Sequence, residues 1–90
     1  MRVPSYSGQF QRDVKRLQRR GKDISKLKRL MELLLEGGAL PPQFKDHPLK
    51  HIWAGYRDAH VDPDWVLIYS ATDERVHFER TGTHEELFES

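Results

Sequence analysis

Apolar residues recur at helical spacing near the start of the chain. Phe10, Val14 and Leu17 lie four and then three positions apart, so a helix would carry them on one face. Ser7 has the hydroxyl group that suits an N-cap, and Gly21 can adopt the left-handed conformation that commonly ends a helix. The pattern predicts an amphipathic helix between these two residues, preceded by a short edge strand over residues 3–7.

A broader apolar stripe follows after a short connection. Asp23 can cap this second helix, and Gly37–Gly38 would end it. Because so short a connection leaves no room for a crossover, we expect the two helices to form an antiparallel hairpin. The apolar face of the second helix comprises Ile24, Leu27, Leu30, Met31, Leu34 and Leu35.

The middle of the chain has the pattern of two strands joined by a tight turn. Residues 50–61 are expected to be extended, with a turn or bulge at Gly55. Asp62–Asp64 contains Pro63 between two aspartates, which is a strong turn signal. Residues 65–69 are continuously apolar, so this strand should be central and covered on both faces.

A last strand and a short helix complete the predicted fold. In residues 75–81, Val76 and Phe78 alternate with a polar set that should face the opposite side of the sheet: His77, Glu79 and Thr81. Thr83 and Glu86 have the spacing of a capping box, which predicts a helix beginning at His84. The result is an α+β fold, with the helix hairpin packed on a mostly antiparallel sheet of four to five strands.

Composition limits the functional classes. The chain has no cysteine, which excludes a disulfide framework and thiolate catalysis. No apolar run approaches the length of a membrane span and the N-terminus has no apolar signal core, so a membrane or secreted protein is not expected. We expect a cytoplasmic protein that forms one domain over residues 1–90.

Charge is unevenly distributed, although the net charge is only +1. Residues 12–29 contain nine basic side chains and two acidic ones, whereas residues 73–90 contain six acids and two arginines. A basic half is typical of a protein that binds a polyanion such as RNA. A pair of solvated helices has the same composition, so charge alone does not decide between the two interpretations.

Histidine is the candidate catalytic residue type, since imidazole exchanges protons near neutral pH. His47, His60 and His84 lie at predicted strand ends and turns, where sites are commonly built; His51 and His77 are interpreted as solvated side chains. The spacing of the first three matches no compact metal signature, which argues against metal binding. The same residues permit metal-free acid–base cleavage of RNA, although composition alone does not establish it. A phosphate would suit the helix start at His84. Trp53 and Trp65 are expected to pack in the core rather than stack on bases.

Four segments of the sequence together carry a family resemblance. They are YSGQF with its following basic helix, KDHPL, W-x-GYRDAHV-x-PDW-x-LIY and FERTGTH-x-x-LF. The chain resembles YafQ toxins of the RelE/ParE superfamily, which belong to bacterial type II toxin–antitoxin systems. The resemblance covers residues 6–88 and implies a RelE-like fold. It also implies a ribosome-dependent endoribonuclease that cuts mRNA in the ribosomal A site without metal or other cofactor.

The resemblance implies roles for individual residues. His84 is the expected catalytic acid, and His60 or His47, assisted by Asp64, the expected base. Phe88 would stack on a base of the substrate. The remaining expected contacts are Arg80 and Asp58 to the substrate, and Lys15, Arg16, Arg19, Arg20, Lys22 and Lys26 to ribosomal RNA.

The expected partners are a DinJ- or RelB-like antitoxin, the 70S ribosome and mRNA, and the free toxin is expected to be a monomer. Two other functions remain open at this point. The chain could be a non-enzymatic inhibitor that binds a target such as gyrase, as ParE-type relatives do, or an inert copy that only binds an antitoxin. Neither alternative requires the histidine set.

Overall fold

The two long helices form where the apolar pattern predicts them. In the computed structural model, which describes residues 1–88, α1 spans Gly8–Arg19 and α2 spans Ile24–Glu36. Ser7 caps α1 by accepting a hydrogen bond from Phe10 N at 2.9 Å, and Gly37 ends α2 with a left-handed φ of 85°. The residues that α1 and α2 bury in the core include Phe10, Leu17, Leu27, Leu30 and Leu34.

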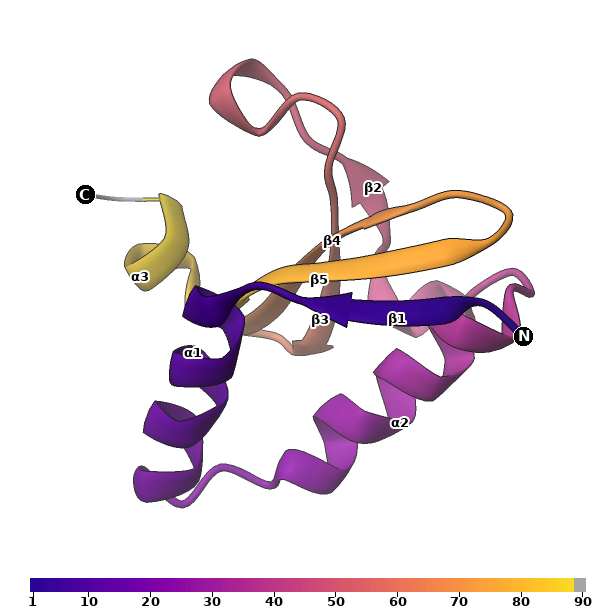
Figure 1. Cartoon of the computed structure of the whole chain (residues 1–90). Helices are drawn as coiled ribbons and strands as arrows, with labels where there is room; N and C mark the ends of the chain where they lie inside the picture. Colours follow the sequence, from indigo (N-terminus) through magenta and orange to yellow (C-terminus); the bar gives the residue numbers. More distant parts are fainter. Residues whose placement is uncertain (89–90) are drawn as a thin grey trace.

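Five strands form one sheet (Figure 1). Their order is β1-β5-β4-β3-β2, in which β1 and β5 are parallel and all other neighbours are antiparallel. The expected mostly antiparallel α+β sheet is therefore confirmed. The strands are β1 (Val3–Tyr6), β2 (His47–Pro48), β3 (Arg57–Asp62), β4 (Trp65–Ala71) and β5 (Arg75–Gly82).

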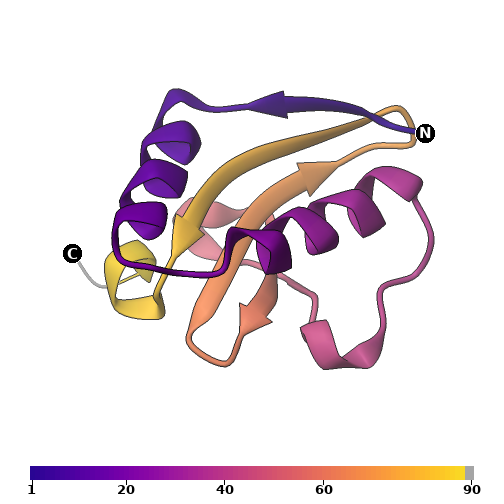
Figure 2. The same cartoon turned by 90° about the horizontal axis from the view of Figure 1, so that it is seen from below.

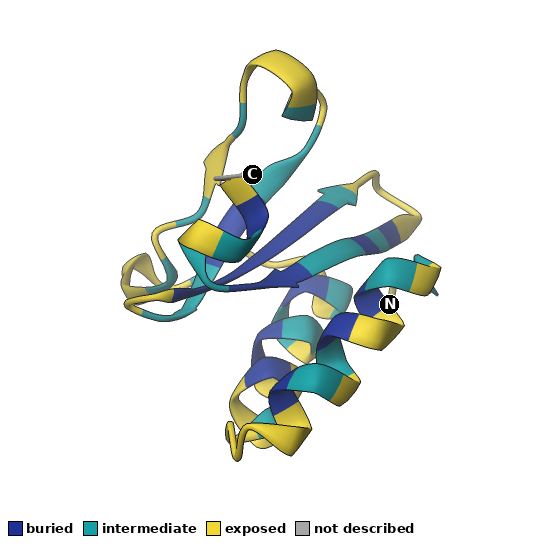
Figure 3. Ribbon diagram, turned by 90° about the vertical axis from the view of Figure 1, so that its left-hand side faces the viewer, coloured by how far each residue is buried: buried dark blue, intermediate teal, exposed yellow. Residues whose placement is uncertain are grey.

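The central strand β4 separates two apolar clusters. Trp65, Leu67 and Tyr69 face α1 and α2, which cover that side of the sheet (Figure 2). Val66 and Ile68 face the other side, where Leu87 packs on them. All five residues are buried, which confirms the expectation of a strand covered on both faces (Figure 3). The second, smaller cluster leaves part of that face open to solvent.

The expected strand over residues 50–61 is wrong in its first half. His51–Trp53 form a single 3₁₀ turn, η2, in a loop that Leu49 N closes by bonding Tyr56 O at 2.9 Å. His51 and Gly55 adopt positive φ angles of 61° and 93°, which a regular strand does not allow. Leu49, Trp53 and Tyr56 instead pack against the cluster around Val66 and Ile68, so tertiary packing outweighs strand propensity here.

A bulge in β5 corrects the expectation that Thr81 faces the opposite side of the sheet from Val76 and Phe78. Tyr69 pairs with Phe78 but its neighbour Ile68 pairs with Arg80, so Glu79 is an extra residue. The alternation of side chains therefore shifts by one beyond Phe78. As a result Thr81 is fully buried on the helix-covered side, where its hydroxyl accepts from Trp65 Nε1 at 2.9 Å.

The last described element is a five-residue helix, α3 (His84–Phe88). Its capping box forms as predicted: Thr83 Oγ1 accepts from Glu86 N at 3.1 Å, and Glu86 Oε1 accepts from Thr83 N at 3.0 Å. The helix lies across the sheet from α1 and α2 (Figure 3). Within residues 1–88, no helix combines the length and apolar character that a bilayer crossing would require.

Candidate active site

Three histidines from distant parts of the sequence meet on the face of the sheet opposite α1 and α2. The ring centroids of His47 and His60 are 6.5 Å apart, and those of His60 and His84 are 5.2 Å apart. His47 belongs to β2, His60 to β3, and His84 begins α3. The structure thus brings together the three imidazoles singled out in the sequence.

Strand register explains this meeting. His47 pairs with Asp58 across β2 and β3, and His60 lies two residues after Asp58, so all three side chains share one face. His60 pairs in turn with Val66 on β4, whose next neighbour is Gly82 at the end of β5. The chain therefore enters α3 two strands from His60 but level with it, and the ring of His84 reaches back to that of His60.

Asp58 lies beneath the imidazoles. Its side chain is only 3% exposed, and its Oδ1 is 2.8 Å from Nε2 of His47. Among the described residues, no hydrogen bond to this oxygen is assigned, so His47 is its one ionic neighbour. Burial raises the pKa of the Asp58 carboxyl, whereas positive charge on His47, His60 and His84 would lower it. The result is a carboxylate that is more basic than an exposed aspartate.

Asp64 and Phe88 flank His84. Asp64 Oδ1 lies 3.5 Å from His84 Nδ1, and its side chain is 77% exposed at the turn between β3 and β4. The centroid of the Phe88 ring is 5.8 Å from that of His84. Because Phe88 remains partly exposed at the end of α3, its ring is available to a ligand above the histidines.

Arg80 shares the sheet face of Asp58, since both pair with Ile68, but its guanidinium turns round the β5 edge to α1. Its Nε donates to Asp13 Oδ2 at 2.8 Å, and its Nη2 donates to Asp13 Oδ1 at 3.3 Å. Arg16 donates to the same carboxylate, again at 2.8 Å. Both guanidinium groups are therefore held by a buried acid on α1, and neither contacts the histidine cluster in the described structure.

The other expected RNA-binding residues remain on the outer surface. Lys15, Arg19 and Lys22 are exposed on α1 and on the turn after it. Arg20 Nη1 pairs with Glu86 Oε2 at 3.0 Å, and Lys26 Nζ lies 3.2 Å from Asp62 Oδ1. These two contacts are solvent-accessible, so they are weak and a phosphate can replace them.

Sequence reasoning missed two features of the site. It treated Asp58 as a substrate contact, although the register places the carboxylate against His47. It also missed a hollow beside His60 that Gln43, Phe44 and Lys45 help to line. The position of Lys45, two residues before His47, was the available signal.

Three residues of the cluster could hold a metal ion. Ligand atoms of His47, Asp58 and His60 all lie within 4.8 Å of one another. Two imidazoles and one carboxylate suit zinc or another first-row transition metal. The same three groups also suit proton transfer, so geometry alone leaves both chemistries possible.

Comparison with known proteins decides the family. The profile described as "Bacterial toxin of type II toxin-antitoxin system, YafQ" matches residues 2–89. The chain belongs to the YafQ toxin family. One YafQ relative, the mRNA interferase toxin YafQ of Escherichia coli strain B/BL21-DE3, is 61% identical over 84 residues, which are 92% of this chain and 91% of the relative.

Solved YafQ structures share the fold. The crystal structure of YafQ from E. coli BL21(DE3) is 57% identical and superposes with a TM-score of 0.93, covering 98% of this chain and 99% of that one. YafQ in the crystal structure of the E. coli DinJ–YafQ complex is 58% identical, with a TM-score of 0.91 and coverage of 98% and 99%. The RelE-like fold expected from the sequence is confirmed.

Proposed function

We propose that this YafQ toxin is an endoribonuclease that cuts mRNA on the ribosome by metal-free acid–base catalysis. The observation that carries the proposal is the cluster of three imidazoles around a buried carboxylate, open to solvent on one side. Cleavage of RNA at a 2′-hydroxyl needs a base, an acid and groups that stabilise the phosphorane, and this cluster supplies all three. The 61% identical relative is named an mRNA interferase toxin, which supports the endoribonuclease part of the proposal.

The two ends of the cluster have different roles: the end at His47 accepts a proton, and the end at His84 donates one. The pair of His47 and Asp58 removes the proton from the 2′-hydroxyl, whose oxygen then attacks the adjacent phosphorus. The bond from phosphorus to the 5′-oxygen breaks as His84 donates a proton to that oxygen. The products are a 2′,3′-cyclic phosphate and a 5′-hydroxyl end. His60, whose ring lies between the other two, stabilises the charge on the phosphorane oxygens.

Asp64 and Phe88 orient the acid and the substrate. From the sequence, Asp64 was expected to assist the base, but its nearest ionic partner is His84, at 3.5 Å. A carboxylate beside Nδ1 can orient the imidazole ring of the acid toward the leaving oxygen. Phe88, next to His84, stacks on the base beside the cleaved bond.

Two macromolecular partners follow from the same surfaces. The exposed cations on and after α1, Lys15, Arg19 and Lys22, are available to ribosomal RNA in the cytoplasm. A DinJ-like antitoxin is the expected inhibitor, because DinJ forms a complex with the E. coli relative. An acidic antitoxin segment would compete for the same cations.

The decisive experiment is to map the 5′ ends of cellular mRNA after brief induction of the wild type and of His84→Ala. We expect discrete cuts within coding frames from the wild type, and a loss of about 100-fold or more in the variant, as for removal of a general acid. His51→Ala is the matched control, since His51 lies in the exposed η2 loop outside the cluster.

Purified components separate the alternatives. Because the ribosome itself requires Mg²⁺, the toxin alone is treated with EDTA and desalted before it meets ribosome-bound message. Cleavage should persist; its loss after this treatment, with recovery on adding Zn²⁺, would instead assign His47, Asp58 and His60 to a metal. Wild-type cutting rates in a folded His84→Ala protein would contradict the acid assignment. Growth arrest without cut message, together with stalled gyrase complexes, would favour the ParE-type binder.

A further inference from the structure

Helix α3 carries both His84 and Phe88, yet it has only five residues. A helix this short has little stability of its own, so its neighbours determine where these side chains lie. Its apolar attachment is Leu87, which packs on Val66 and Ile68. One side chain on one sheet face does not fix the rotation of a helix about that contact.

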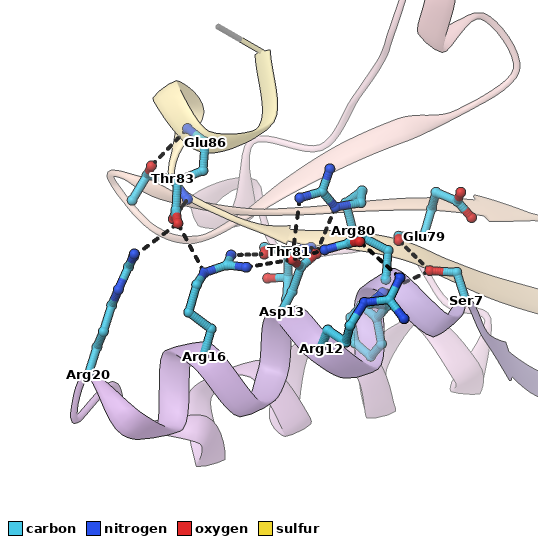
Figure 4. Close-up of polar contacts among 12 residues, drawn as sticks. Ser7, Arg12, Asp13, Arg16, Arg20, Glu79, Arg80, Thr81, Thr83 and Glu86 are labelled. Carbon is cyan, nitrogen blue, oxygen red and sulfur yellow. Dashed lines mark hydrogen bonds and ion pairs between the residues drawn. The ribbon is translucent and has the colours of Figure 1, made fainter. Parts of the chain in front are cut away.

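A polar attachment on the other side of α3 supplies the missing restraint. Glu86 Oε2 lies 3.0 Å from Nε of Arg16 and 3.0 Å from Nη1 of Arg20 (Figure 4). The other oxygen of Glu86 accepts from Thr83 N in the capping box. Glu86 thus joins the start of α3 to the outer face of α1. Positive charge on both arginines and the Thr83 N–H hold its pKa low despite burial, which raises it.

Arg16 is fixed at its other end by a buried acid. Its Nη1 donates to Asp13 Oδ1 at 2.8 Å, and the Asp13 side chain is 0% exposed. Asp13 also accepts from Arg80 and from Thr81 N, at the edge of β5 that β1 leaves uncovered. Burial raises the pKa of Asp13, but these hydrogen bonds, chiefly from Arg80 and then Arg16, hold it below its usual value. Arg16 therefore spans two carboxylates, one rigid and one on α3.

The backbone leaves room for this bridge. A Cβ atom on Gly82 would lie 3.1 Å from Arg16 Nη2 and 3.1 Å from Glu86 Oε1. Gly82 has no left-handed φ, so its backbone conformation does not demand glycine. The missing side chain instead lets Arg16 and Glu86 approach each other directly over Gly82, the last residue of β5.

We propose that Arg16 and Glu86 are positioning residues for cleavage. Their ion pair holds α3 at the rotation that directs His84 toward His60. The proposal rests on the proposed function, because His84 is the acid that it positions. It changes the role of Arg16 from the expected RNA contact to a link between the core and the catalytic helix.

Steady-state cleavage of ribosome-bound message tests this role. Arg16→Ala and Glu86→Gln should each lower kcat about tenfold while KM stays within about twofold, as for a misplaced catalytic group. Glutamine preserves the capping box, so Glu86→Gln removes the charge without removing the cap. Arg16→Lys should not restore kcat, because one ammonium group does not span both carboxylates. The matched control is Arg12→Ala on the exposed side of α1, where a change in KM alone is expected.

A second measurement is independent of activity. NMR contacts between the rings of His60 and His84 should weaken in Arg16→Ala and in Glu86→Gln but persist in Arg12→Ala, with thermal melts showing that all variants fold. Unchanged ring contacts, or an Arg16→Ala protein with raised KM and normal kcat, would overturn the proposal. If the wild type cuts no message, the proposed function fails, and the ring contacts still decide whether Arg16 positions α3.

Discussion

At the scale of single residues, Asp58 makes opposing contributions to folding and catalysis. Its carboxyl is buried and its pKa is raised by that burial, so the ionised form costs folding free energy at neutral pH. The same shift makes the group a stronger base beside His47. Active sites commonly retain such a cost because activity depends on the group that causes it.

Asp58→Asn should therefore stabilise the toxin and inactivate it. Asparagine has nearly the same shape but is never charged, so we expect a gain on the order of 1 kcal/mol, or about 5 °C in Tm, at pH 8. Cleavage should fall about 100-fold. Because the folded-state pKa is raised, the difference in Tm should shrink as the pH falls and the wild-type carboxyl becomes protonated. An Asp58→Asn protein that is less stable than the wild type at pH 8 would show that the buried Asp58 carboxylate does not cost folding free energy.

At the scale of elements, the two long helices, the Pro63 turn and the cap were predictable, whereas the 3₁₀ turn η2, the β5 bulge and the contacts of Asp13 were not. The helix bounds, the Pro63 turn and the capping box follow from local residue types, and all are confirmed. The single buried acid on α1 could not be distinguished from solvated charges, because its partners Arg80 and Thr81 lie 67 and 68 residues away. The bulge that buries Thr81 also has no local signal, since it depends on pairing with β4.

The capping box gives a test at this scale. Thr83→Ala removes the oxygen that accepts from Glu86 N, which should cost about 1 kcal/mol and loosen α3 first. The Leu87 amide, bonded to Thr83 O at 3.1 Å, should exchange with solvent faster than amides of β4. Cleavage should fall in Thr83→Ala because α3 is loosened. Thr83→Ser should retain both the slow exchange of the Leu87 amide and the cleavage. If the Leu87 amide exchanges at the same rate in Thr83→Ala as in the wild type, the cap does not hold the helix.

At the scale of the whole molecule, the network around Asp13 connects α1, β5 and α3. Removing one member of a buried ion-pair network leaves its partners uncompensated, which is more costly than losing an exposed pair. Asp13 also accepts from the backbone N–H of Thr81, on the β5 edge that β1 does not reach. The network therefore supports the fold and the site together.

Asp13→Asn should destabilise the toxin by about 3 kcal/mol at pH 7. The folded-state pKa of Asp13 is lowered, so its contribution is present above the unfolded pKa of about 3.8 and is lost as the pH falls through the lower folded value. The difference in stability between wild type and variant should accordingly narrow below about pH 4. Urea unfolding at several pH values measures this difference. If it stays constant with pH, the stabilisation by Asp13 does not come from its charge.

The parallel pairing of the first and fifth strands has a consequence for synthesis. Ser5 and Ser7 bond residues 72 positions later, so the N-terminal strand has no partner until β5 has emerged from the ribosome. His84 follows β5, which means that the imidazole cluster is completed only after β5 has been made. Docking of the first strand and assembly of the histidine cluster are thus late and linked events, and a fragment that stops before β5 should have neither.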